Sequence, residues 1–68
     1  MPGKIKKMID SIAQQSANGI PALIPLTLSK LILKGIDVYE YTETSPDDPA
    51  VIARLQQIAS ELGVSARI

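Results

Sequence analysis

The chain lacks both cysteine and histidine in its 68 residues. Without cysteine no disulfide bond can form, and without either residue the usual zinc and haem-attachment sites are excluded. Histidine is also the commonest general base near neutral pH, and cysteine is a common nucleophile. We therefore expect no enzymatic activity, no cofactor and no metal site. The missing cysteines fit a reducing compartment, which favours a cytoplasmic location if the protein is natural.

An excess of charge is also missing, because seven basic residues balance seven acidic ones. Zero net charge argues against non-specific binding of nucleic acid. Residues 1–36 carry five lysines and one aspartate, whereas residues 37–68 carry two arginines and six acids. We expect the two halves to attract each other when they pack.

No uninterrupted apolar run reaches the roughly 18 residues that a membrane span requires. The most apolar stretch, residues 20–36, is interrupted by two prolines, two lysines and a glycine. The amino end is basic but lacks the continuous apolar region of a signal peptide. We expect neither a membrane span nor a signal peptide.

Apolar residues recur at amphipathic-helix spacing in three segments, 4–17, 26–34 and 49–62. We predict an all-α, compact three-helix domain over residues 1–68, without a sheet. The pattern leaves open whether residues 20–24 add a short helical turn before the second helix. The residues predicted to face inward are Ile5, Met8, Ile9, Ile12, Ala13 and Ala17 in the first helix, Leu28, Leu31 and Ile32 in the second, and Val51, Ile52, Leu55, Ile58, Ala59 and Leu62 in the third.

The helix ends have recognisable signals. Asp48 can cap the third helix, with Pro49 at the first helical position, where no backbone N–H is needed. If Ser45 were the cap instead, Pro49 would lie where the helix needs a backbone N–H donor, so we favour Asp48. Pro25 disfavours a helical conformation at Ile24. Glycine followed by a β-branched residue ends each helix, which predicts three Schellman caps; the pairs are Gly19-Ile20, Gly35-Ile36 and Gly63-Val64.

The acidic connection, residues 37–48, alternates like a strand from Val38 to Thr42 but has no second run to pair with. We predict an ordered loop. Asp47 and Asp48 could form a carboxylate pair for a metal, but we interpret them as acids favoured at a helix start. Two carboxylates at the start of the third helix would also repel DNA phosphates, although five lysines could form a modest basic patch; they are Lys4, Lys6, Lys7, Lys30 and Lys34.

Residues 20–28 read IPALIPLTL and contain more apolar surface than a small helical core needs. A 68-residue domain has little further interior in which to bury these side chains. An exposed apolar patch usually marks an interaction site, and tyrosine is enriched in such sites. The predicted partner-binding residues are Ile20, Leu23, Ile24, Leu26, Leu33, Tyr39 and Tyr41.

These patterns predict a non-enzymatic protein–protein binding module that acts on no small-molecule substrate. The contrast between the apolar middle and the polar flanking helices suggests an engineered binder on a small helical scaffold. One alternative is a homodimer that uses the same apolar surface; another is a weak DNA-binding regulator. A further alternative is that part of the apolar set, such as Leu23 and Leu26, packs under the helices as ordinary core.

Overall fold

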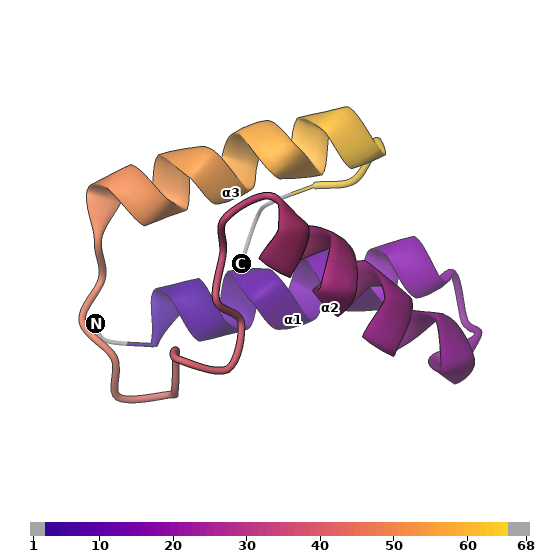
Figure 1. Ribbon diagram of the computed structural model, residues 1–68, viewed down its shortest axis with the longest axis horizontal. Helices are drawn as coiled ribbons and strands as arrows, with labels where there is room; N and C mark the ends of the chain where they lie inside the picture. The colour runs from indigo at the N-terminus through magenta and orange to yellow at the C-terminus, as the bar shows by residue number, and fades with distance from the viewer. Residues whose placement is uncertain (1–2, 66–68) are drawn as a thin grey trace.

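A computed structural model describes residues 3–65 and shows the predicted all-α, three-helix architecture (Figure 1). No strand forms within these residues, and the acidic connection is a loop with turns. The elements in chain order are α1 (Lys4–Ala17), the 3₁₀ helix η1 (Pro21–Leu23), α2 (Ile24–Leu33) and α3 (Pro49–Leu62). The first and third helices begin and end where the sequence pattern places them. η1 is the short helical turn that the sequence left open between α1 and α2.

α1 is the central helix of the domain. Both α2 and α3 pack against it, whereas α2 and α3 have few direct contacts with each other. α1 contributes four large, fully buried side chains, more than either of the other helices. The connected core consists of Ile5, Met8, Ile9, Ile12, Leu31, Ile36, Val38, Leu55, Ile58 and Ala59.

Two adjacent aspartates cap two different helices. The Asp48 carboxylate accepts a hydrogen bond from the backbone N–H of Ala50 over 3.0 Å, which confirms the predicted cap of α3. The Asp47 carboxylate accepts from the backbone N–H of Lys4 over 3.1 Å, at the first residue of α1. A negative charge is favourable at both positions because the amino end of a helix carries unpaired N–H groups. Asp47 thus fixes the acidic loop to the start of α1.

Two of the three glycine pairs form the predicted Schellman cap. Ile36 N–H donates to Leu31 C=O, and Val64 N–H donates to Ala59 C=O, the bond that defines this motif. The prediction is wrong for the first pair. Asn18 (φ 50°) and Gly19 (φ 82°) are both left-handed, and Ile20 N–H donates only three residues back to Ala17. This tighter turn leaves the Ile20 side chain exposed.

Two predictions about α2 are corrected. Ile24 is helical despite the following proline, because η1 already directs the chain into the helix and Pro25 lies in the first turn, where no N–H donor is needed. Ile32 was predicted to face the core but is 43% exposed. The buried side of α2 is centred instead on Thr27 and Leu31.

Opposite charges from the two halves of the chain meet between α2 and α3. The Lys34 ammonium group lies 3.6 Å from a Glu61 carboxylate oxygen. The Arg54 guanidinium donates to the Lys34 carbonyl oxygen over 3.4 Å. These contacts join the carboxyl end of α2 to α3, where direct apolar contact is sparse.

None of the helices in residues 3–65 is both long enough and apolar enough to cross a bilayer. The same residues hold no group of three or more acidic side chains arranged to bind a metal ion.

Candidate functional site

The outward side of α2 is apolar along the length of the helix. Residues 26, 29 and 33 share one face because they are spaced three and four apart, and residues 25 and 32 lie beside them. Four of these five residues are apolar, and all five are exposed. We call this surface the α2 face; it comprises Pro25, Leu26, Ser29, Ile32 and Leu33.

The exposure of the α2 face is large for aliphatic side chains. Leu33 is 86% exposed, Leu26 is 53% exposed and Ile32 is 43% exposed. The opposite side of the helix already supplies the core through Leu31, which is fully buried. A helix that is apolar on all sides is normally buried on all sides. The domain therefore buries one apolar side of α2 and leaves the other apolar side exposed.

The single polar side chain on the α2 face is already hydrogen-bonded within the helix. The Ser29 hydroxyl donates to the Pro25 carbonyl oxygen over 3.0 Å, a common arrangement for serine inside helices. The face therefore offers little polar functionality to a partner. Contact with it would be dominated by apolar burial.

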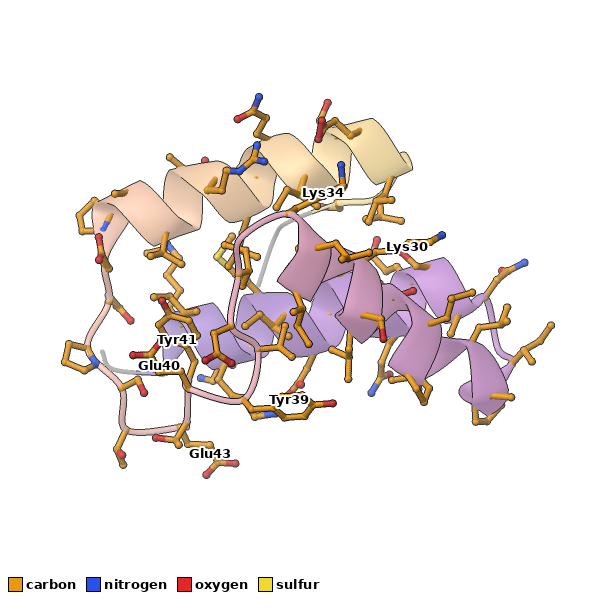
Figure 2. The ribbon with its side chains drawn as sticks, viewed as in Figure 1. Lys30, Lys34, Tyr39, Glu40, Tyr41 and Glu43 are labelled. Atoms are coloured by element: carbon orange, nitrogen blue, oxygen red, sulfur yellow. The ribbon has the colours of Figure 1, made fainter. Side chains whose placement is uncertain are left out.

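The other predicted site residues are divided between the surface and the core. Ile20 and Leu23, at the two ends of η1, are exposed, and Ile24 is half-buried. Both tyrosines lie on the loop after α2 (Figure 2). Tyr39 is exposed, whereas Tyr41 is half-buried and packs against the core.

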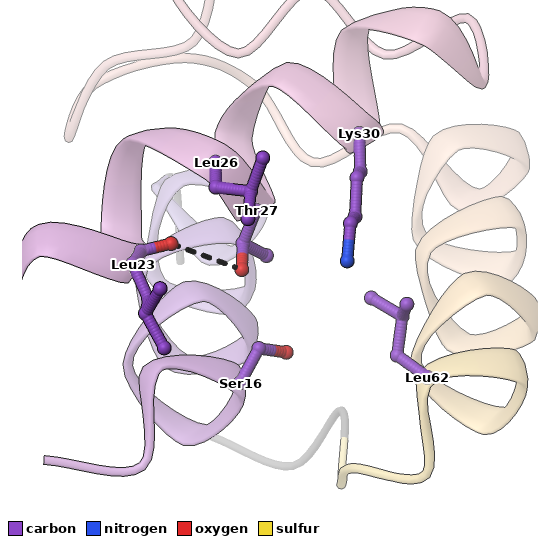
Figure 3. Close-up of a pocket in the computed structure, with 6 residues that line it drawn as sticks. All are labelled: Ser16, Leu23, Leu26, Thr27, Lys30 and Leu62. Carbon is purple, nitrogen blue, oxygen red and sulfur yellow. Dashed lines mark hydrogen bonds between the residues drawn. The ribbon is translucent and has the colours of Figure 1, made fainter. Parts of the chain in front are cut away.

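A pocket of about 210 Å³ opens between the three helices, beside the α2 face (Figure 3). α1 contributes one lining residue, α3 contributes one, and η1 and α2 contribute the rest. Of the lining residues that lie within 3–65, three are leucines and none is acidic. The lining residues are Ser16, Leu23, Leu26, Thr27, Lys30 and Leu62.

Three polar groups converge on this pocket. The Ser16 hydroxyl oxygen is buried and has no hydrogen-bond partner among residues 3–65. The Thr27 hydroxyl donates to the Leu23 carbonyl oxygen over a long 3.4 Å. The Lys30 side chain extends from α2 toward Leu62 and forms no ion pair within residues 3–65 (Figure 3).

Sequence reasoning did not identify the pocket, although one signal for it was present. Ser16 lies seven residues after Ile9 and four after Ile12, so it falls on the apolar stripe of α1. A hydroxyl on a core-facing stripe needs a partner, and its presence there is a reason to examine what it faces. Lys30 and Leu62 carry no such signal, because only the packing of α2 and α3 on α1 brings them together.

A second hollow, of about 260 Å³, lies on the other side of η1. It is shallower and is lined by residues from the end of α1, the turn and the start of α2. Ile20 and Ile24 are its large apolar residues. It extends the exposed apolar surface around η1 without adding a charged group.

No protein-family model, curated protein or solved structure matches this chain, so the site is interpreted from its own geometry.

Proposed function

We propose that this chain is a non-enzymatic protein-binding module whose contact surface is the α2 face together with exposed residues of η1. The observation that supports the proposal most directly is the exposure of Leu26, Ile32 and Leu33 on one side of a helix whose other side forms the core. Burying Leu33 against a partner would contribute roughly 1.5–3 kcal/mol, and the half-exposed Leu26 and Ile32 would each contribute about half as much. Apolar patches of this kind on small proteins commonly mark interaction sites.

The geometry of the surface fits helix-mediated recognition. The exposed aliphatic side chains repeat at helical spacing, so a partner groove could receive them as successive anchors. Pro21 and Pro25 restrict the backbone at the start of the surface, which lowers the conformational entropy lost on binding. Tyr39 adds an exposed aromatic ring on the loop that follows α2.

Self-association is the alternative use of the same surface. Zero net charge places little electrostatic repulsion between two copies, and an apolar face can pack against its own copy about a two-fold axis. Sedimentation equilibrium from about 5 to 500 µM, bracketing the weak association expected of a small interface, separates the alternatives. A monomer throughout excludes the homodimer and leaves the hetero-partner.

The DNA-binding alternative receives less support from the positions of the lysines. Lys6 forms an ion pair with Asp10 on α1, and Lys34 pairs with Glu61. Lys30 extends into the pocket between α2 and α3. Three of the five lysines are therefore divided among different contacts. A gel shift at low salt that shows a retarded DNA band would revive this alternative.

The test of the proposed function compares the wild type with Leu33→Asp and Leu26→Asp. Both residues are exposed, so both variants should keep the helical circular dichroism of the wild type. A partner isolated by cross-linking should bind the purified wild type directly, and each variant should lower its affinity at least about tenfold, since a carboxylate would be desolvated in an apolar contact.

Ser60→Asp, on the exposed side of α3, is the matched control and should bind like the wild type. If every partner binds all four proteins equally, the α2 face is not the contact surface.

An engineered origin of the α2 face is a further hypothesis, which rests on the contrast between α2 and its polar neighbours. The test is a variant in which Leu23, Ile24, Leu26 and Leu33 are all replaced by polar residues. A variant that stays folded and loses its partner supports a contact face added to a stable scaffold. A variant that unfolds shows that these residues are part of the core.

A further inference from the structure

We propose that the pocket between α1, α2 and α3 binds an aliphatic carboxylate. The apolar chain would lie between Leu23 and Leu62, and the carboxylate would lie between the Lys30 ammonium group and the Ser16 hydroxyl (Figure 3). This inference goes beyond the proposed function. The pocket shares Leu26 with the α2 face but also requires Ser16, Lys30 and Leu62, which are not part of the proposed contact surface.

The first argument is the unpaired hydroxyl of Ser16. Its oxygen is buried from solvent by the surrounding protein and yet makes no hydrogen bond to it. Buried polar atoms of this kind are rare, because an unmade hydrogen bond is costly. Ser16 lines the pocket, so a turn of its side chain about χ1 would bring the hydroxyl, which a ligand oxygen does not reach in its present rotamer, into contact with a bound carboxylate.

The second argument is charge. Among residues 3–65, Lys30 is the only charged residue that lines the pocket, and no acid from this range pairs with it. Lys6 and Lys34, in contrast, both form ion pairs with nearby acids. A carboxylate bound beside Lys30 would gain a charge-assisted hydrogen bond, which solvent screens in part because Lys30 is exposed. A neutral acceptor would gain a weaker hydrogen bond from this group, and a cationic ligand would be repelled by it.

The third argument is size and shape. Pockets that bind drug-sized molecules measure about 300–1,000 Å³, whereas this one measures about 210 Å³. It therefore suits one short aliphatic group and excludes a large ring system. The three leucines supply an apolar wall from η1, α2 and α3. The required chemistry is a short aliphatic chain that ends in a carboxylate.

Two sources offer that chemistry: a free fatty acid, and the carboxyl-terminal residue of a peptide. The probes are octanoate and a short peptide ending in leucine with a free carboxylate. Their matched controls are 1-octanol and the same peptide with its terminus amidated. Binding is followed by the chemical shifts of the Ser16, Thr27 and Leu62 amides in a titration of the whole chain.

We expect at least one of the two acids to bind with a dissociation constant on the order of 1 mM. Its neutral control should bind about tenfold more weakly, because the hydrogen bonds to a charged acceptor are lost. Octanoate binding alone would indicate a free fatty acid as the ligand, and peptide binding alone would indicate a protein terminus. Binding of neither acid overturns the proposal, as does equal binding of acid and neutral control.

Lys30→Met and Ser16→Ala test the two polar groups. Lys30→Met keeps a long side chain and should weaken binding of the acid about tenfold, whereas Lys7→Met, at an exposed position on α1, should not change it. Ser16→Ala should weaken binding severalfold without loss of folding. Unchanged binding in Lys30→Met overturns the inference even if Ser16→Ala fails to fold.

Leu33→Asp keeps this result separate from the proposed function. Leu33 does not line the pocket, so the variant should bind octanoate or the peptide like the wild type while losing a protein partner. If Leu33→Asp abolishes binding of the acid as well, the acid binds the α2 face and not the pocket.

Discussion

The backbone N–H of Gly3 donates a hydrogen bond to the carbonyl oxygen of Ser45 over 2.9 Å. Gly3 has a left-handed conformation (φ +87°), and the Glu43 carbonyl group lies where a Cβ atom would point. With the bond from Lys4 to Asp47, this contact holds the acidic loop against the start of α1. The loop is therefore a structural part of the domain.

Gly3→Ala should destabilise the protein more than Gly19→Ala. Both glycines have positive φ, so each substitution costs about 1–2 kcal/mol of backbone strain. A Cβ at Gly19 meets nothing within 4 Å, whereas a Cβ at Gly3 would collide with Glu43 backbone atoms. We expect about 2–4 kcal/mol for Gly3→Ala, measured by urea unfolding. Equal losses in the two variants would mean that the loop moves away without cost.

Leu31→Ala and Leu33→Ala should differ sharply although both residues are leucines near the end of α2. Leu31 is fully buried, so its truncation leaves a cavity and should cost about 2–5 kcal/mol of unfolding free energy. Leu33 is 86% exposed, and its truncation should change stability by no more than about 0.5 kcal/mol. A large loss for Leu33→Ala that grows with protein concentration would show that a second copy covers it.

Ser16→Ala should stabilise the ligand-free protein, which is the opposite of its expected effect on binding. The substitution removes a buried hydroxyl that lacks a partner, a gain of about 1 kcal/mol. Ser60→Ala is the control, because Ser60 is exposed on α3 and gains only helix propensity. Thermal unfolding of both variants separates the two contributions. A lower melting temperature for Ser16→Ala would indicate that the hydroxyl is hydrogen-bonded in solution.

Stability should fall at alkaline pH through Tyr41. Burial raises the pKa of its phenol above the usual 10.0, and the nearby carboxylates of Glu40, Asp48 and Asp37 raise it further. Because the folded state resists ionisation of Tyr41, its stability is intact below pH 10 and is lost as pH rises from there through the folded pKa.

Urea unfolding of the wild type and Tyr41→Phe between about pH 8 and 11.5 measures this contribution, since the range spans the ordinary tyrosine pKa. The stability of the wild type should decline relative to Tyr41→Phe above pH 10. Tyr39→Phe is the control, because its ring is exposed. If Tyr41→Phe loses stability in parallel with the wild type, other groups cause the alkaline decline.

The parts of the fold that depend on local sequence were predictable. α3 follows from a single apolar stripe and from Asp48, whose carboxylate caps a helix only two residues away. The Schellman caps at Gly35 and Gly63 are equally local. At Gly19 the same local signal failed, because the adjacent Asn18 also adopts the left-handed conformation and closes a tighter turn.

The orientation of α2 could not be predicted in the same way. Its apolar residues surround the helix, so their spacing does not distinguish the buried side from the exposed one. This is why Ile32 was assigned to the core and is exposed instead. The pocket was even harder to predict from the sequence. Its residues Ser16, Lys30 and Leu62 come from three helices, and only tertiary packing makes them neighbours.

The central position of α1 has a consequence for how the domain opens. Since α2 and α3 contact α1 far more than each other, we expect α2 to detach before the α1–α3 interface opens, once its contacts with Glu61 and Arg54 are broken. Amide hydrogens of α2 should accordingly exchange with solvent faster than those of α1. A molecule held between Leu23 and Leu62 would connect the two outer helices directly, and exchange would then slow in both of them together.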